Sequence, residues 1–140
     1  MGRVLGIDFG EKRCGVALSD PTHFIASAHS VISYRNIAEV YRQVKLLCDE
    51  HDVEKVVVGL PLNMDGSMGP SARNAQVFAE ALETRGNVPV TTWDERLSTK
   101  SAEDALIEAG TRRDKRKGIV DKVAAQILLQ HYLDAHQETY

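Results

Sequence analysis

The stretch from Arg3 to Asp20, RVLGIDFGEKRCGVALSD, decides the fold because it predicts two strands joined by a tight turn. Two apolar runs, Val4–Phe9 and Cys14–Leu18, flank Gly10–Arg13, a pattern typical of a β-hairpin. Asp8 lies inside the first run, where an ionised carboxylate is costly unless a cation or several hydrogen-bond donors compensate its charge. Asp8 is therefore either a candidate cation ligand or a buried aspartate bonded to the backbone amides of its own turn.

The composition predicts one globular domain over residues 1–140. With 43% hydrophobic and 26% charged residues the chain has enough apolar side chains for a core, and its net charge of −3 does not by itself indicate a nucleic-acid partner. No apolar run approaches the ~20 residues of a membrane span, and the N-terminus enters a strand without a leader pattern. Cys14 and Cys48 lack metal-ligand spacing and are expected as core thiols. We expect a cytoplasmic protein, a monomer or weak homodimer.

The hydrophobic periodicity and the turn residues predict the element order βββαβαβαα. After the hairpin, the predicted elements are a strand at Phe24–Ile32, a helix from Asn36 to near His51, a strand at Lys55–Leu60, a helix starting at Pro70, a strand at Val88–Trp93, a helix from Ser98 or Thr99 to Gly110, and a last helix after the polar bridge Thr111–Gly118. Antiparallel strands come first and crossover helices follow. This order predicts the α/β ribonuclease H-like architecture, a mixed five-stranded sheet with helices on both faces.

Three carboxylates fall where such a sheet could gather them. Asp8 is in the first strand, Glu95 follows the strand that ends at Trp93, and Asp121 is expected in the first turn of the last helix. Ligands collect at the carboxyl ends of parallel strands, and clustered carboxylates repel one another unless divalent cations lie between them. The expected cofactor is Mg²⁺ or Mn²⁺, and two such ions ~4 Å apart catalyse phosphodiester hydrolysis.

Each of these assignments has an alternative. Asp94 competes with Glu95, because strand alternation directs only one of the two towards Asp8. Asp121 alone is explained by the helix macrodipole, which stabilises an acid in a first turn. Arg96 can pair with either neighbouring acid or contact a phosphate.

Basic residues indicate the partner. The segment from Arg112 to Lys122 is net positive within an acidic chain and lies beside the predicted acidic site, which favours phosphate contacts over a merely solvated face. The Gly-containing loop before Pro70 offers donors near a helix N-terminus, although such loops are also common as plain turns. The predicted nucleic-acid contacts are Lys12, Arg13, Asn63, Arg73, Arg96, Arg113, Arg116, Lys117 and Lys122.

Four stretches in this order closely resemble the YqgF family of Holliday-junction-resolvase-like proteins, which are regarded as pre-16S ribosomal RNA nucleases. They are GIDFGEKRCGVALSD, VVGLPLNMDGS, WDERLST and KRKGIVDKVAAQILLQHYL. The resemblance implies a ribonuclease H-like nuclease with a metal site, and it assigns the acidic ligands to Asp8, Glu95 and Asp121. Cys14 stands where the family more often has a branched apolar residue. The implied substrate is the 5′ end of precursor 16S ribosomal RNA, with branched DNA as the alternative.

Two other protein classes share part of this pattern. The opening hairpin also resembles the phosphate loop of sugar kinases and actin-like ATPases, but that class needs two such domains, for which 140 residues leave no room. A non-catalytic RNA-binding assembly factor could keep the fold without its chemistry. The complete acidic trio favours the nuclease over this second class.

Overall fold

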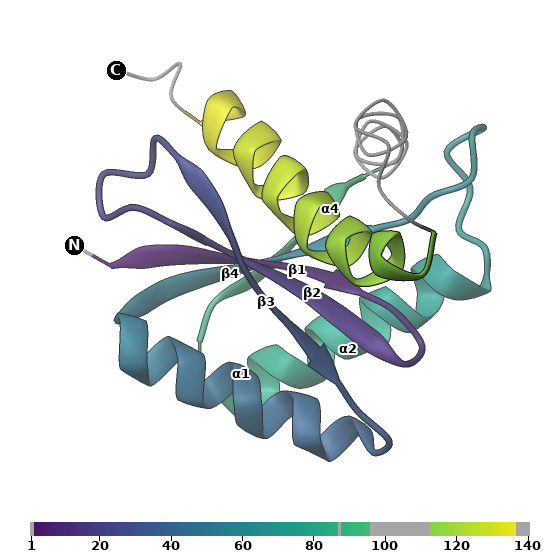
Figure 1. The fold of residues 1–140 in the computed structure, drawn as a ribbon, viewed down its shortest axis with the longest axis horizontal. Coiled ribbons are helices and arrows are strands. Elements are labelled where there is room, and N and C mark those ends of the chain that lie inside the picture. The colour runs from purple at the N-terminus through teal and green to yellow at the C-terminus, as the bar shows by residue number, and fades with distance from the viewer. Residues whose placement is uncertain (1, 87, 96–112, 137–140) are drawn as a thin grey trace.

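The computed structural model describes residues 2–86, 88–95 and 113–136, and of residues 113–121 it describes the backbone alone. The elements are β1 (Arg3–Phe9), β2 (Arg13–Ser19), β3 (Ala26–Ser33), α1 (Ile37–His51), β4 (Val53–Leu60), α2 (Pro70–Gly86), β5 (Val90–Asp94) and α4 (Arg113–Ala135). The strands form one five-stranded sheet in the order β3-β2-β1-β4-β5 (Figure 1). The pairs β1–β2 and β2–β3 are antiparallel, whereas β1–β4 and β4–β5 are parallel, which confirms the predicted mixed sheet.

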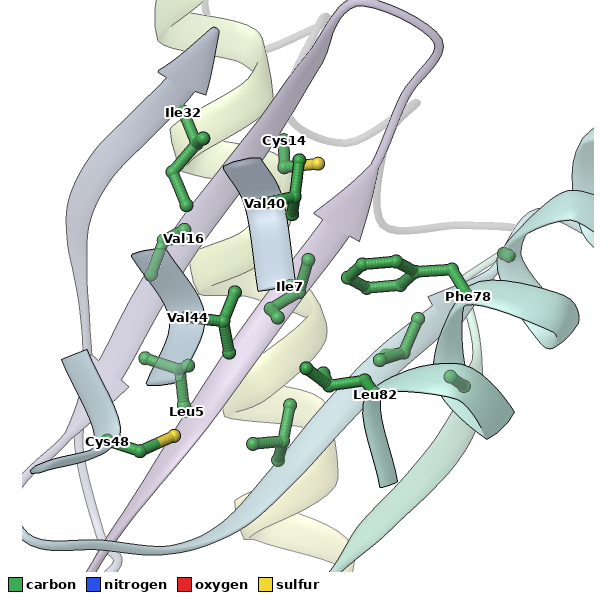
Figure 2. Close-up of a cluster of buried hydrophobic side chains, with 14 residues drawn as sticks. Leu5, Ile7, Cys14, Val16, Ile32, Val40, Val44, Cys48, Phe78 and Leu82 are labelled. Atoms are coloured by element: carbon green, nitrogen blue, oxygen red, sulfur yellow. The ribbon is translucent and has the colours of Figure 1, made fainter. Parts of the chain in front are cut away.

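Helices cover both faces of this sheet, with α1 and α2 on one side and α4 on the other (Figure 1). Strand alternation divides the apolar residues between two cores. Leu5 and Ile7 of β1 pack beneath α1 and α2 in the cluster that Figure 2 shows. Val4 and Val57 pack on the opposite face against α4. Each fully buried aliphatic side chain contributes about 1.5–3 kcal/mol, so both faces hold the sheet between its helices.

Local sequence signals account for the helix ends. Asn36 is the N-cap of α1, where its side-chain oxygen accepts a hydrogen bond of 2.9 Å from the amide of Ala38. Asp52 closes the same helix in a left-handed conformation, with φ at 53°, and its amide donates to the carbonyl of Cys48. Pro70 begins α2 as predicted, because its missing N–H costs nothing in a first helical turn.

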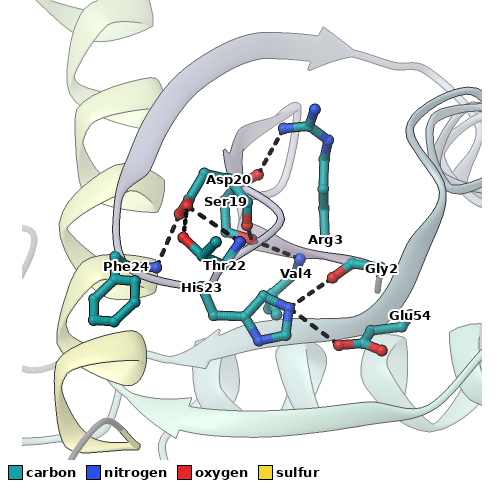
Figure 3. Close-up of polar contacts among 9 residues, drawn as sticks. All are labelled: Gly2, Arg3, Val4, Ser19, Asp20, Thr22, His23, Phe24 and Glu54. Atoms are coloured by element: carbon teal, nitrogen blue, oxygen red, sulfur yellow. Dashed lines mark hydrogen bonds and ion pairs between the residues drawn. The ribbon is translucent and has the colours of Figure 1, made fainter.

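The third strand begins at Ala26 and not at Phe24, because the Asp20 side chain holds the chain in a turn (Figure 3). One Asp20 oxygen accepts hydrogen bonds of 2.9 and 2.8 Å from the amides of Phe24 and Ile25. Its other oxygen accepts from the amide and the hydroxyl of Thr22. These amides therefore serve the turn and not the β2–β3 ladder, and Phe24 and Ile25 are left 57% and 63% exposed.

The last helix differs from its prediction at its start. It is described from Arg113, so residues 113–118 of the expected polar bridge are helical. Arginine and lysine are good helix formers, and one glycine does not stop a helix of this length. Asp121 therefore lies more than two turns inside α4, beyond the reach of the macrodipole effect that could have explained it. The helix predicted to end at Gly110 lies outside the described residues.

The apolar spacing of the last helix predicts a buried stripe, which the structure confirms in part. The predicted stripe is Val120, Val123, Ala124, Ile127, Leu128 and His131. Ala124 and Leu128 are buried as predicted, whereas His131 is exposed. Ala125, Leu129 and Tyr132 are buried in addition. Periodicity could not decide between these stripes, because the helix carries apolar residues on two adjacent sides. The small side chain of Ala125 instead faces the sheet and lets the helix approach β1 closely.

Cys14 and Cys48 are both buried in the core beneath α1 and α2, as expected, and both are free thiols. Burial raises the pKa of the Cys48 thiol to about 11, so this cysteine is an inert apolar side chain. None of the helices in the described part of the chain has the length and apolarity that a membrane span requires.

The Asp20 turn generates a pH prediction. Its hydrogen bonds hold the pKa of Asp20 below the ordinary value, so ionised Asp20 stabilises the fold above about pH 4, and this contribution is lost as the pH falls below that value. Asp20→Asn should lower the free energy of unfolding by only about 1 kcal/mol at neutral pH, since the residue is half-buried and solvent screens its carboxyl group. Urea unfolding of both proteins should show this difference shrinking towards about pH 3.

Asp49→Asn is the matched control, because Asp49 is an exposed carboxylate on α1. This control should not show the same pH-dependent difference from the wild type. A difference for Asp20→Asn that is equal at neutral and acid pH would contradict the role given to the carboxylate.

Candidate active site

Two acidic residues meet at the edge of the sheet where the parallel strands end. Asp8 is the next-to-last residue of β1, and Glu95 directly follows β5. The Glu95 amide donates a hydrogen bond of 3.2 Å to the carbonyl of Leu60, the last residue of β4. Alternation along β1 places Asp8 on the α4 face, together with Val4 and Gly6. Parallel pairing thus brings together residues that are far apart in the chain.

The carboxyl group of Glu95 is buried without full compensation. Its residue is only 5% exposed, and its Oε2 atom has no hydrogen-bond partner among the residues that the structure describes. Burial raises the pKa of Glu95 far above its ordinary value, and the adjacent charge of Asp8, a hydrogen bond with Asp8 and the charge of Asp94 raise it further. In the absence of a cation, the Asp8–Glu95 pair therefore retains a proton that isolated carboxyls would lose at neutral pH.

Gly59 makes the room for this buried carboxyl group. A Cβ atom at Gly59 would lie 2.0 Å from Glu95 Oε2 and 2.8 Å from its Cδ, and 3.0 Å from a methyl group of Leu128. Gly59 and Asp8 are neighbouring positions on parallel strands, each directly after the pair Ile7–Val58. The sequence analysis missed Gly59, although a glycine within a β-branched strand is a known sign of close approach by another group.

The helix α4 covers the acidic pair and runs antiparallel to β4. Tyr132 lies near the start of β4, where Lys55 Nζ is 5.3 Å from its ring centre, and Leu128 lies near Gly59 at the other end of the strand. Earlier residues of α4 therefore continue towards the carboxyl ends of the parallel strands (Figure 1). The backbone of Asp121 is one turn before Ala125, in this earlier part of α4.

The other predicted site residues that the structure describes lie around this edge without joining the acidic pair. Asp94 ends β5 and is exposed, so Glu95 is the acid that lies against Asp8. Lys12 is exposed in the β1–β2 turn, and the neighbouring Arg13 is half-buried. Asn63 uses its amide to donate a hydrogen bond of 3.0 Å to Ser67 Oγ within its own loop.

Two more of the predicted nucleic-acid contacts lie on helices. The side chains of the remaining ones are not described. Arg73 is exposed in the first turn of α2, and Lys122 is half-buried on α4. Arg96 lies outside the described residues. Only the backbones of Arg113, Arg116, Lys117 and Asp121 are described, all within α4.

The described residues fit a divalent cation in part. Asp8 and Glu95 supply oxygen ligands of the kind that Mg²⁺ and Mn²⁺ prefer, and the unpartnered Oε2 of Glu95 is an acceptor without a donor. Among the described side chains there is no group of three histidine, cysteine, aspartate or glutamate residues that could hold a metal ion. Any third protein carboxylate would have to come from the part of the chain whose side chains are not described, which includes Asp121.

Comparison with known sequences identifies similar proteins over nearly the whole chain. The family model described as RuvX: Holliday junction resolvase matches residues 2–135. Relatives from Syntrophomonas wolfei, Halothermothrix orenii and Listeria innocua are each named "Putative pre-16S rRNA nuclease". They are 49%, 47% and 48% identical over 94% of this chain and 94%, 94% and 97% of their own length. The family resemblance that the four sequence motifs indicated is confirmed.

Solved structures show the same fold at much lower identity. Thermus thermophilus RuvC in complex with a Holliday junction substrate aligns with a TM-score of 0.62 and 19% identity, covering 99% of this chain and 98% of that one. A fowlpox virus resolvase bound to Holliday junction DNA gives 0.54 and 16%, covering 95% and 97%. The large terminase nuclease of phage G20c gives 0.53 and 14%, covering 89% and 80%. These likenesses concern the fold alone and confirm the predicted architecture.

The fit of Glu95 into the space above Gly59 can be tested by Gly59→Ala. The added methyl group would overlap the glutamate carboxyl, which must move away from Asp8. If the acidic pair is the catalytic centre, cleavage of nucleic acid should fall by at least about tenfold, since small misplacements of catalytic groups are costly. Gly86→Ala is the matched control, because its Cβ would meet the nearest side chain at 3.4 Å, and Gly86 precedes β5 whereas Glu95 follows the other end of that strand. Equal activity in the two variants would show that the position of Glu95 does not matter.

Proposed function

We propose that this chain, which belongs to the RuvX family, is a metal-dependent nuclease that processes the 5′ end of precursor 16S ribosomal RNA. The single observation that carries the catalytic part is the meeting of Asp8 with Glu95. Placing a buried acid, Glu95, against the half-buried Asp8 is unfavourable in an otherwise well-packed protein, and such pairs are common where a catalytic group or a cation needs them. The names of the relatives supply the substrate.

In this proposal Asp8 and Glu95 hold the cation, with Asp121 as a third ligand. When bound, Mg²⁺ or Mn²⁺ supplies an activated water and stabilises the charge on the leaving oxygen. The protein contributes geometry: the ends of β1 and β5 fix the two acids, and Gly59 gives Glu95 its place. Leu128 and the rest of the apolar α4 face exclude water from the inner side of Glu95, which strengthens its interaction with positive charge.

The course of α4 supports the assignment of Asp121 and of the basic segment. Both lie in the part of the helix that continues towards the carboxyl ends of β1 and β4. Positions 113, 116 and 117 share one face of α4 by helical spacing, so their basic residues could follow one phosphate backbone. Lys12 and Arg73, which are exposed at the same edge of the sheet, would extend this contact on the other side of the acids.

Precursor ribosomal RNA is the favoured substrate because the curated relatives carry that name at nearly half identity. The description of the family model as a Holliday junction resolvase favours branched DNA as the second candidate. A cytoplasmic location, with the protein as a monomer or weak homodimer, agrees with the two free thiols but is otherwise part of the proposal.

The test is to incubate purified protein with precursor 16S RNA and with a four-way DNA junction, in Mg²⁺, in Mn²⁺ and with a chelator. We expect cleavage of the RNA that requires the metal. Asp8→Asn and Glu95→Gln should each abolish it, since the amides are nearly isosteric but lack the charge that binds the cation. Each variant should also melt at a higher temperature than the metal-free wild type, because the repulsion between the acids is removed.

Asp94→Asn is the matched control, since Asp94 is exposed beside the buried pair and should be less damaging than Glu95→Gln. Wild-type cleavage by Asp8→Asn would show that the acids do not hold the metal. Cleavage of the DNA junction in preference to the RNA would show that branched DNA is the substrate, and the assignment of the acidic site would still hold.

The basic segment should contribute affinity and not chemistry. Replacing Arg113, Arg116 and Lys117 by alanine should reduce the slope of log K against log salt by roughly one for each phosphate contact that is lost. Turnover at saturating substrate should change little, because the acids remain. A salt titration of RNA binding, with single-turnover cleavage beside it, measures both. The double variant Arg42→Ala/Lys45→Ala on α1 is the control. An unchanged salt slope in the triple variant would show that the segment is a solvent-exposed helix end without phosphate contacts.

A further inference from the structure

A cavity of about 550 Å³ opens between the N-terminal turns of α1 and α2, on the face of the sheet opposite the acidic pair. Its volume lies in the range of small-ligand sites. Val77 and Ile37, at 63% and 36% exposed, line it and present apolar surface to water. Asn74 and Ser71 add polar groups from the first turns of α2. The cavity therefore combines an apolar wall with a few polar groups, which include the acid Glu11.

Aromatic rings form the floor of this cavity, and their planes are nearly parallel. Phe9 and Phe78 stack with ring centres 4.3 Å apart and an interplanar angle of 12°. Tyr41 continues from Phe78 at 5.7 Å and 11°, and Tyr34 lies 6.2 Å from Phe9 at 21°. Phe78 is stacked between Phe9 and Tyr41 and is only 2% exposed, and Arg85 lies 5.0 Å from the ring centre of Tyr41. The ring best placed for stacking with another planar ring is therefore Tyr34, which ends the row and lines the cavity.

A second hollow of about 560 Å³ adjoins the first and carries positive charge. The two share Tyr34 and Arg35, so they form one continuous surface. Lys12 and Arg13 line the second hollow together with Arg35, against a single acid, Glu39. An apolar aromatic cavity that leads into a basic hollow matches a molecule with a flat apolar part and an adjacent anionic part.

This surface is connected to the acidic pair through β1. Phe9 follows Asp8 directly, and strand alternation sends the two side chains to opposite faces of the sheet. The β1–β2 turn, with Lys12 at its tip, is the piece of chain that separates the two sites. A strand of nucleic acid held at the acids could thus pass over this turn and reach the cavity.

We propose that the cavity receives an unpaired nucleobase of the substrate, while Lys12, Arg13 and Arg35 hold the phosphate that follows. The inference rests on the proposed nuclease function and adds the requirement that the substrate has a single-stranded segment beside the cleaved bond. The occupant is a nucleotide and not an apolar peptide, because the two hollows together have three cations against two acids, and all three cations line the adjoining hollow. Stacking with backbone neutralisation is the general way in which proteins hold single strands.

The test measures how much of the affinity comes from the bases. A fluorescent oligoadenylate and the same oligomer with abasic riboses are titrated with wild-type protein in a chelator, so that neither is cleaved. Stacking of one base predicts about tenfold tighter binding of the oligoadenylate. Val77→Glu should reduce this ratio to about one, because covering the new charge with a base is unfavourable. The ratio cancels the general electrostatic effect of the substitution, since both oligomers carry the same phosphates.

Leu46→Glu is the matched control for Val77→Glu, because Leu46 is an apolar residue of α1 that is 59% exposed and does not line the cavity. It should keep the tenfold ratio. Arg35→Ala should weaken binding of both oligomers alike, whereas Arg42→Ala, outside both hollows, should weaken neither. Arg35 is exposed, so its variant keeps the test valid if Val77→Glu does not fold.

The outcomes separate this inference from the proposed function. A wild-type ratio near one, or a tenfold ratio that persists in Val77→Glu, would overturn the nucleobase site even if the protein cleaves RNA. Equal binding by Arg35→Ala and the wild type would overturn the phosphate contact. A base-dependent ratio that is lost in Val77→Glu supports the site even if no cleavage is observed, in which case the proposed function alone has failed.

Discussion

The close approach of α4 to the sheet is the constraint on which the rest of this structure depends. Gly6 and Gly59 remove two side chains at the contact, so Leu128 and Leu129 pack directly over β1 and β4. The same missing Cβ at Gly59 leaves the space that the carboxyl group of Glu95 fills. Packing and catalytic geometry therefore use one and the same feature, and neither could change without the other.

At the Asp8–Glu95 pair, the arrangement proposed for function lowers the stability of the fold. A buried carboxyl with an unpartnered oxygen next to a second acid is unfavourable by several kcal/mol at most sites, and here the pKa of Glu95 rises in response. The two apolar cores on either side of the sheet offset this cost, because they bury many aliphatic side chains besides Leu128, which lies at the charged edge. A cation bound between the acids would remove the repulsion, which couples metal binding to stability.

The central strand divides the molecule into two chemically different sides. Asp8 faces α4 and the acids, and the next residue, Phe9, faces α1, α2 and the aromatic cavity. The period of two along a β-strand is the reason that neighbours in the sequence serve opposite faces. The β1–β2 turn carries Lys12 between these sides, so basic charge lies where a substrate would cross from one to the other.

The sequence by itself determined the order of the described elements and the mixed sheet, though not the starts of β3 and α4. Strand and helix periods, the Asn36 cap and the Pro70 start are local signals. It also indicated Asp8 as an unusual residue in an apolar strand. Only the tertiary structure decided that Glu95, and not Asp94, lies against Asp8, because a single residue of register reverses which face a side chain meets. The buried stripe of α4 and the space above Gly59 were likewise decided by contacts between distant segments, which no local pattern encodes.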